Sequence, residues 1–382
     1  MPLDFAPSPR SSVGLEWELA LVDADSGNLR QVAPAVMDAL AADERARYVK
    51  PEFLRNTLEV VSDVCDTVGS AVRDLEAGIA AIRDVIEPMR AEIMGAGTHP
   101  FAHWSQQQVT DKQRYATVVD RTQVWGRQQV VYGVHVHVGI EDRAKVLPIV
   151  RSLLVYVAHL QALSASSPYW GADDTGYASM RALIFQQLPT AGLPYQFAEW
   201  GQLEQYVDDM LKTGVIDDFT EVRWDVRPAP HFGTVEVRVC DGTSNVLELA
   251  ALGALVHCLV EHFSTLLDEG RELPAMPRWF VHENKWRAAR YGMDAIIILD
   301  ADGNEELITD ALPRLLDELA PVAARLGCTA ELEGVHEIVR AGASYQRQRA
   351  VAAAHGGGQP GLEAVVRSLV AELRAGRPLP VG

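Results

Sequence analysis

Polar and apolar residues alternate along five short stretches of the chain, and this two-residue period predicts β-strands. Within each stretch one set of alternate side chains is mainly aliphatic, whereas the other set includes charged or imidazole groups. Because successive side chains of a strand point to opposite faces of a sheet, each strand should bury one face and present ionisable groups on the other. The stretches are residues 13–23, 57–62, 132–140, 221–228 and 233–242.

Apolar residues at three- and four-residue spacing predict helices elsewhere in the chain. The clearest cover residues 72–93, 147–163 and 246–267, and the chain after Arg278 is mostly helical with a break near Gly356. Residues 164–181 are rich in Ser, Pro, Gly and Asp, which predicts an ordered loop.

Strands with short connections and helices of unequal length favour the α+β class over a regular doubly wound fold. We therefore expect a mixed, largely antiparallel sheet backed by helices. Residues 1–12 are expected to form a tail and residues 13–382 a single domain, with no internal repeat.

The first predicted strand carries two carboxylates on one face. Glu16 and Glu18 point to the same side, whereas Leu15, Trp17 and Leu19 point to the other. Two carboxylates about 7 Å apart along a strand repel each other unless cations neutralise them, and hard divalent ions readily bind oxygen ligands. For one such pair taken alone, a solvent-exposed strand face is the simpler explanation.

The same arrangement recurs on later strands. His135 and His137 share one face of their strand, which favours a shared ligand or phosphate. Glu236 and Arg238 also share one face, where they fit either a cross-strand ion pair or a site for a carboxylate or phosphate. Glu59 adds another carboxylate. If these faces lie on one side of one sheet, they form a trough suited to magnesium and a polyphosphate.

The charge and the cysteine content argue against several classes of protein. With 52 Asp and Glu against 34 Lys and Arg, the net charge of -18 repels phosphate backbones, so we expect no nucleic-acid binding. The four cysteines lie far apart in the sequence, which fits a reducing compartment better than a disulfide framework or a zinc site. The start of the chain has no apolar leader, and no stretch reaches roughly 18 uninterrupted apolar residues. We therefore expect a cytoplasmic protein that does not bind a membrane.

Common nucleotide-binding and hydrolase motifs are missing from the sequence. There is no GxxxxGK phosphate loop, no GxGxxG after a strand and no GxSxG elbow. The string HCLVEH at residues 257–262 resembles a zinc-protease motif, but its histidines are five residues apart and lie about 140° apart around a helix. These patterns argue against a P-loop NTPase, a dinucleotide-binding enzyme and a zinc protease.

Motifs spread from Val13 to Ala350 resemble those of the type 2 glutamate-cysteine ligases, a carboxylate–amine ligase family related to glutamine synthetase. They occur in the family's order and approximate spacing, and together they are highly specific. The resemblance implies a curved, mainly antiparallel sheet with helices packed on its convex side, whose concave face holds ATP and Mg²⁺, with Mn²⁺ as an alternative ion. The motifs are GLEWELALVD, LEVVSD, GTHPF, YGVHVHVGI, SSPYWGADDTGYASMRALIFQQLPTAG, FGTVEVRVCD and ENKWRAARYGMDA.

The resemblance also implies roles for individual side chains. The implied metal ligands are Glu16, Glu18, Glu59, His135 and Glu236. The residues implied to act at the substrate carboxylate or the transferring phosphate are Arg181, Glu236 and Arg238. The residues implied to bind the nucleotide or its phosphates are His137, Lys285, Arg287 and Arg290. A helical arginine is often at the surface or ion-paired, so that alternative stays open for Arg287 and Arg290.

The reaction implied is that of an ATP-dependent ligase, which converts the side-chain carboxylate of glutamate into an acyl phosphate and joins it to an amine. The amine is cysteine in the reaction that names the family. Two alternatives stay open, namely a small-molecule kinase of the same fold and a non-catalytic nucleotide or metabolite sensor. The amine acceptor and the number of metal ions stay open too, and a homodimer is compatible with the family.

Overall fold

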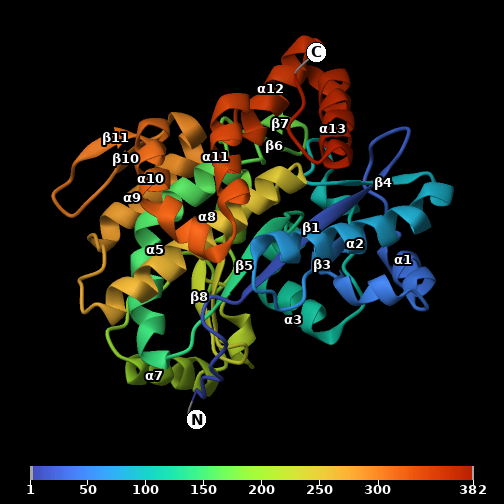
Figure 1. Cartoon of the computed structure of the whole chain (residues 1–382). Helices are drawn as coiled ribbons and strands as arrows, with labels where there is room; N and C mark the ends of the chain where they lie inside the picture. The colour runs from blue at the N-terminus through green and yellow to red at the C-terminus, as the bar shows by residue number, and fades with distance from the viewer. Residues whose placement is uncertain (1–2, 381–382) are drawn as a thin grey trace.

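The computed structural model describes residues 3–380 and contains a seven-stranded sheet with helices packed on it (Figure 1). The strand order is β2-β3-β1-β5-β9-β8, and β4 also pairs with β1. The pairings in this sheet are antiparallel, which confirms the predicted sheet type. Its strands are β1 (Val13–Asp23), β2 (Val49–Pro51), β3 (Thr57–Val61), β4 (Ala91–Met94), β5 (Gly133–Gly139), β8 (Val226–Ala229) and β9 (Thr234–Asp241).

Helices and two small hairpins make up most of the remaining described chain. The hairpins pair β6 (Tyr169–Trp170) with β7 (Asp173–Asp174) and β10 (Ile296–Ile298) with β11 (Glu305–Leu307). The helices are α1 (Ala33–Leu40), α2 (Val68–Ile86), α3 (Gln113–Thr122), α4 (Val124–Arg127), α5 (Arg143–Ser164), α6 (Met180–Phe185), α7 (Trp200–Lys212), α8 (Val246–Asp268), α9 (Arg278–Tyr291), α10 (Ile308–Leu326), α11 (Thr329–Ala341), α12 (Ser344–Ala354) and α13 (Gly358–Ala375).

The main core lies between one face of the sheet and the helices α2, α5 and α8, which pack on it (Figure 1). Leu15, Trp17 and Leu19 of β1 are buried in this core, as the alternation predicted. The two longest helices begin at side-chain caps, because Asn245 accepts a hydrogen bond from the Glu248 N–H of α8 and Asp142 accepts one from the Ala144 N–H of α5. This packing leaves the opposite face of the sheet for the polar side chains.

The predicted helix over residues 72–93 is wrong at its C-terminal end. Helix α2 ends at Ile86, a 3₁₀ turn spans Glu87–Met89, and β4 follows. Pro88 cannot donate the backbone hydrogen bond that would continue the helix, and Arg90 adopts a left-handed conformation with φ of 52°. Ile93 is nevertheless buried in the core, where it lies on β4. Its position happens to match the helical spacing, which is why the predicted helix was too long.

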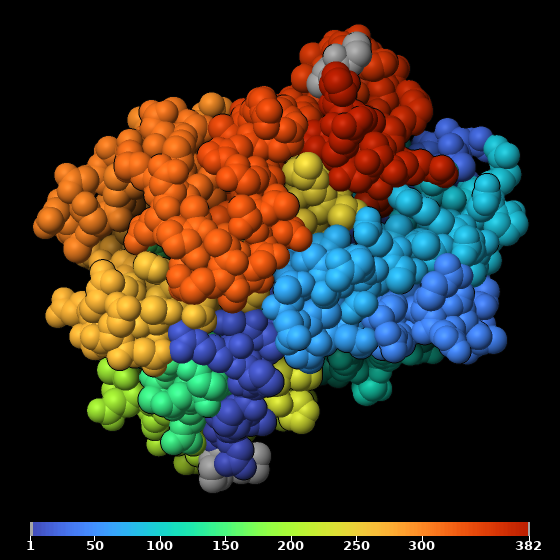
Figure 2. Space-filling view, viewed as in Figure 1, coloured from blue at the N-terminus to red at the C-terminus, as the bar shows by residue number. Residues whose placement is uncertain are grey.

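Helices α5 and α8 are long and apolar enough to span a membrane by length and composition, with a mean hydropathy of 1.6. In each case 83% of that apolar window is buried inside the protein, as in the core helices of a soluble domain. The segment before β1, predicted as a tail, packs on the fold, since the Ala6 N–H donates to the Pro230 carbonyl and the Ser8 N–H to the Ile140 carbonyl. Figure 2 shows this N-terminal segment and the C-terminal helices at opposite ends of one face.

Candidate active site

Strand register brings the ionisable faces of β1, β3, β5 and β9 together on the open side of the sheet. Neighbouring strands place two carboxylate–histidine pairs and one carboxylate pair directly opposite each other. Directly opposite side chains are within contact distance in an antiparallel sheet. The opposed pairs are Glu16 with His135, Glu18 with Glu59, and His137 with Glu236.

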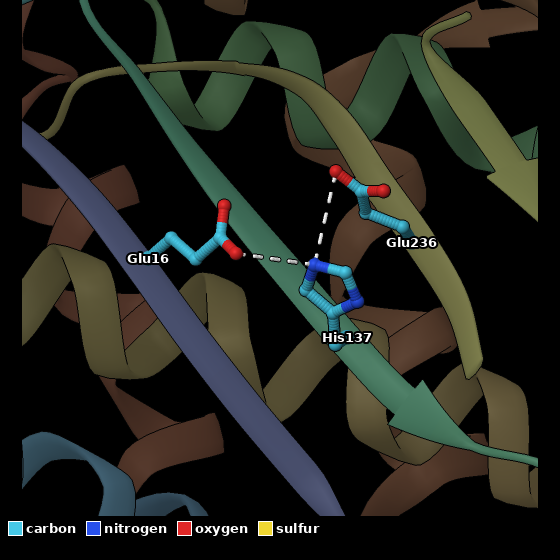
Figure 3. A group of neighbouring side chains, drawn as sticks. All are labelled: Glu16, His137 and Glu236. Carbon is cyan, nitrogen blue, oxygen red and sulfur yellow. Dashed lines mark ion pairs between the residues drawn. The ribbon is translucent and has the colours of Figure 1, made fainter. Parts of the chain in front are cut away.

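Glu16, His137 and Glu236 point toward one another from three adjacent strands (Figure 3). The His137 Nε2 atom lies 3.4 Å from Glu16 Oε1 and 3.7 Å from Glu236 Oε1. The other Glu16 oxygen, Oε2, lies 2.8 Å from the Nδ1 atom of His135. Glu16 thus joins the two histidines in one polar cluster.

Two further groups of possible ligand atoms overlap with this one. Glu16, Glu59 and His135 form the second group, and Glu18, Glu52 and Glu59 form the third. Within each of the three groups the ligand atoms lie within 4.8 Å of one another. Carboxylate oxygens at this density fit the preference of Mg²⁺ and Mn²⁺ for oxygen ligands. The residues present therefore fit a site for divalent cations.

The carboxylates of the third group carry unfavourable charge. Burial raises the pKa of Glu18 to about 7, and the charge of Glu52 adds to this shift. Burial also raises the pKa of Glu59 well above its usual range, assisted by the charges of Glu16, Glu52 and Glu18. No Lys or Arg side chain ion-pairs with Glu18, Glu52 or Glu59 within residues 3–380. Positive charge bound beside these carboxylates would offset their mutual repulsion and their burial.

Two other carboxylates keep their charge through protein partners. Burial opposes ionisation of Glu16, but hydrogen bonds from His135 and His137 outweigh it and hold the pKa of Glu16 well below its usual range. Burial also opposes ionisation of Glu236, which is 1% exposed, yet Arg238 and Arg227 lower its pKa far below the usual value. Both groups are therefore anionic at neutral pH.

The two histidines differ in charge state. Burial lowers the pKa of His135 to about 4, and the charge of Arg238 adds to that effect. His135 is therefore neutral at pH 7 and has the form that binds metal ions. For His137, burial is outweighed by the charges of Glu236 and Glu16, which raise its pKa. His137 is thus the histidine that carries positive charge more readily and suits a phosphate.

Two predicted arginines reach the cluster from different elements. Arg238 follows Glu236 on β9 and donates to its carboxylate, while Arg181 comes from α6 and is only 3% exposed. A Cβ atom added to Gly133 would lie 2.1 Å from the Arg181 guanidinium, so only glycine leaves room for this arginine beside β5. The Gly133 N–H also donates to Glu18. Gly133 thus positions an acid and an arginine at once.

Two cavities adjoin the cluster, and its members are divided between them. The first, of about 140 Å³, is lined by Glu18, Glu52 and His135 together with Arg181, Arg223 and Arg238. The second, of about 340 Å³, is lined by Glu16, Glu59 and His137 together with Lys50, Phe232 and Thr234. We call them the arginine cavity and the Phe232 cavity.

Three predicted nucleotide-binding residues lie apart from the cluster, on α9. Lys285 is buried in an ion pair with Asp225, with 2.6 Å between Nζ and Oδ2. Arg287 forms ion pairs with Glu283 and Glu305, and Arg290 donates to the Gly176 carbonyl. None of the three lines the arginine cavity or the Phe232 cavity. Their assignment to the nucleotide stays a prediction.

Three residues at the site were not singled out from the sequence. Arg227 lies opposite Glu236 and donates to it, with 2.6 Å between Nε and Oε2. Arg223 lies on the arginine cavity. Both could have been found, because EVRWDVRP alternates in the same way as the other site strands. Glu52 had no such signal, since it follows a strand of only three residues.

Comparisons with known proteins agree with this architecture. The sequence profile of the family described as glutamate-cysteine ligase family 2 matches residues 12–368. A relative from Arthrobacter sp. (strain FB24), provisionally named glutamate–cysteine ligase 2-1, is 55% identical over 98% of this chain and 99% of its own length. A relative from Mycobacterium ulcerans (strain Agy99), provisionally named glutamate–cysteine ligase 2, is 56% identical over 97% of this chain and 93% of its own length.

Solved structures share the fold at low sequence identity. A glutamate–cysteine ligase from Francisella tularensis, crystallised with AMP, aligns with a TM-score of 0.67 at 15% identity, covering 99% of this chain and 91% of that one. A bifunctional glutathione synthetase from Pasteurella multocida aligns with a TM-score of 0.63 at 17% identity, covering 94% of this chain and 52% of that one. The chain therefore belongs to glutamate-cysteine ligase family 2, and it is an ATP-dependent ligase that forms a carbon–nitrogen bond.

Proposed function

We propose that this ligase uses ATP and Mg²⁺ to activate the side-chain carboxylate of glutamate as an acyl phosphate, which an amine then converts into a γ-glutamyl amide. The observation that carries this proposal is the convergence of four strands on a cluster of carboxylates and histidines that separates two cavities. The relatives named for the glutamate–cysteine reaction support glutamate as the acid.

The acidic cluster suits the ions of such a reaction. Glu16, Glu18, Glu59, His135 and Glu236 would hold them, and Glu52 adds a further oxygen donor. When bound, divalent cations neutralise the polyphosphate, so that an anionic carboxylate can approach it. His137, which lies between Glu16 and Glu236, is placed to donate a hydrogen bond to a phosphate oxygen.

The arginine cavity suits glutamate. Arg181 and Arg238 both line it, and the Nε atom of each is buried with no hydrogen-bond partner in the described residues. A buried donor without a partner costs free energy, and a carboxylate or phosphoryl oxygen would satisfy it. Arg238 also ion-pairs with Glu236, so it links the substrate carboxylate to the acidic cluster.

The Phe232 cavity suits the nucleotide. Phe232 is 62% exposed and can stack on a base, while Lys50 supplies a cation.

The arginine cavity is partly covered by Tyr115 of α3, which lines it and whose hydroxyl donates to Glu52 at 3.2 Å. This cover would exclude water from the acyl phosphate, which otherwise hydrolyses.

The test is a coupled ADP-release assay with Mg²⁺, glutamate and a panel of amino acids and amines. The proposal predicts that ADP, inorganic phosphate and a γ-glutamyl amide form in equal amounts. A phosphorylated product without amide would instead identify a kinase, and the absence of ADP release with every acceptor would favour a sensor.

The variant Glu236→Gln tests whether the acidic cluster takes part in catalysis. It keeps the size of the side chain but removes the charge that Arg227 and Arg238 neutralise, so turnover should fall by about 100-fold or more. The matched control is Glu76→Gln on the exposed side of α2, which should leave turnover unchanged. Unchanged turnover in Glu236→Gln would contradict a catalytic role for the cluster.

A further inference from the structure

Arg223 is a cation at the arginine cavity that forms no ion pair with a carboxylate of residues 3–380. It precedes β8, where its N–H donates to the Thr190 carbonyl at 3.1 Å and its guanidinium to the Glu221 carbonyl at 2.9 Å. None of the ion pairs formed by residues 3–380 includes Arg223. By contrast, Arg227 and Arg238 both pair with the Glu236 carboxylate. The guanidinium of Arg223 thus donates to one carbonyl oxygen, that of Glu221, and to no carboxylate in the described residues.

The surroundings of Arg223 make this arrangement costly. Burial lowers its pKa to about 10, against the charge of Glu221, and the nearby charges of Arg238 and Arg227 lower it further. Arg223 therefore stays cationic at neutral pH in a partly buried place beside two other arginines. A desolvated charge without a partner destabilises a fold unless a ligand compensates it. Its position thus indicates an anionic ligand.

Arg223 also lines a second, smaller space that the acidic cluster does not reach. A recess of about 20 Å³ adjoins the cavity, and Arg223, Val118 and Leu188 line both spaces. Neither Arg181 nor Arg238 lines the recess, and none of the cluster carboxylates does. An anion at Arg223 therefore occupies a different part of the cavity from one held by Arg181 and Arg238.

We propose that Arg223 binds the carboxylate of the amine acceptor and thereby makes the enzyme select an α-amino acid over a plain amine. This inference rests on the proposed ligase function, which leaves the acceptor open. In an α-amino acid one carbon separates the amine from the carboxylate, so a carboxylate held at Arg223 directs the amine toward the activated carbonyl. Val118 and Leu188 leave apolar surface for a small uncharged side chain.

The step that Arg223 would orient is balanced. The amine nitrogen attacks the acyl carbonyl carbon and forms the carbon–nitrogen bond, the bond from that carbon to the phosphate oxygen breaks, and inorganic phosphate leaves. The amine nitrogen loses one proton to the solvent or to the departing phosphate. Arg223 takes no part in bond making, so it is a positioning residue for the acceptor.

The experiment compares two acceptors that differ only in the carboxylate, L-cysteine and cysteamine, with L-alanine and ethylamine as a second pair. Amide formation is measured at saturating ATP, Mg²⁺ and glutamate. The wild-type enzyme should prefer each amino acid by about 100-fold in kcat/KM, because the plain amine leaves a partly buried arginine unpaired. Arg223→Gln should reduce the preference to about 5-fold or less, chiefly by raising KM for the amino acid.

Two further variants control for loss of fold and loss of charge. Arg223→Lys keeps the charge and should restore part of the preference. Arg340→Gln removes an exposed arginine of α11 that pairs with Glu337 and lines neither the cavity nor the recess, and it should leave the preference unchanged. In Arg223→Gln the KM values for glutamate and ATP should stay within about 2-fold of the wild type.

The outcomes separate this inference from the ligase proposal. If amide forms equally well from cysteine and cysteamine, or if Arg223→Gln raises the KM of glutamate or ATP instead, the assignment of Arg223 is overturned while the ligase function stands. If no acceptor yields amide, both fail together. The wild-type preference tests the acceptor class without any variant, and unchanged KM values for glutamate and ATP show that Arg223→Gln is folded when its preference is compared.

Discussion

Replacing Glu59 by glutamine tests the proposed binding of metal ions by the acidic cluster through stability, independently of turnover. Glu18, Glu52 and Glu59 have carboxylate oxygens within 4.8 Å of one another. At that distance and an effective dielectric constant of about 20, each fully ionised pair repels by about 3 kcal/mol. The raised pKa of Glu59, caused by burial and then by Glu16, Glu52 and Glu18, means that the metal-free protein avoids this repulsion by keeping Glu59 protonated.

The variant Glu59→Gln therefore replaces one neutral group by another of the same size in the metal-free protein. The unfolding free energy without metal should change by less than about 1 kcal/mol. With Mg²⁺ at 100 times its Kd, the wild-type protein should gain about 2.7 kcal/mol. For 382 residues the entropy of unfolding is on the order of 0.8 kcal/mol/K, so this gain raises Tm by about 3 °C.

The assay is thermal unfolding in the presence of a chelator and again with Mg²⁺. The Glu59→Gln variant should keep the wild-type Tm in chelator and show less than about 1 °C of the Mg²⁺-dependent increase, because it lacks a ligand oxygen with negative charge. Glu76→Gln on α2 should behave as the wild type in both conditions. A full Mg²⁺-dependent increase in Glu59→Gln would refute the assignment of this carboxylate to the ion.

Other predictions concern single contacts. Gly133→Ala should displace the Arg181 guanidinium and lower kcat/KM by about 10-fold or more in the ADP-release assay, with an unchanged circular dichroism spectrum. Burial lowers the pKa of His159 to about 4, so below its unfolded pKa of about 6.5 the unfolded state binds a proton that the folded state does not. Stability should therefore fall by about 3 kcal/mol between pH 6.5 and 4, and urea titrations should show a flatter pH profile for His159→Gln. Arg347→Ala should cost about 3–5 kcal/mol in denaturant unfolding, since it leaves two buried glutamates unpaired, whereas the exposed Arg340→Ala should cost less than about 1 kcal/mol.

The sequence predicted the parts of the fold where one physical signal dominates. Strands β1, β5 and β9 bury one face completely and carry ionisable groups on the other, so the two-residue period was unambiguous for Glu16, His135 and Glu236. The same period holds for residues 221–228, which lead into β8, but Arg223 and Arg227 there alternate with Asp225 and fit an ordinary exposed face equally well. A pattern alone does not tell a site from a salt-bridged surface.

Other elements lacked a local signal because long-range contacts define them. Glu52 joins the cluster only because β2 pairs with β3, which places Lys50 opposite Glu59 and brings the next residues over the same face. Helix α3 has only a short apolar stripe of Tyr115, Val118 and Val119, and of these Tyr115 alone is buried, although Tyr115 and Val118 both line the arginine cavity. The positions of Glu52 and α3 therefore could not be predicted from the local sequence.

A β-bulge between β5 and β9 could not be predicted from the two-residue period. The register of β5 against β9 shifts between Val134 and Val136, so that both Arg238 and Val239 lie opposite His135. Beyond this β-bulge the two-residue period is reversed, and Asp241 lies opposite Gly133, on the side of the sheet that holds the site. Regular alternation predicts the opposite face for Asp241, because it is an odd number of residues away from Glu236.

The reversed position of Asp241 has a direct consequence for the site. Its carboxylate is fully buried and accepts hydrogen bonds from the hydroxyls of Ser167 and Ser179, and the Ser167 oxygen accepts one from the Arg181 N–H. Without the extra residue in β9, this carboxylate would face the helices of the apolar core, where a charge without hydrogen bonds costs several kcal/mol. The bulge therefore gives Asp241 its serine partners, and these hold the N-terminus of α6 and the backbone of Arg181 beside β5, so the position of this arginine depends on a residue count in β9 as well as on the Ser179 cap of α6.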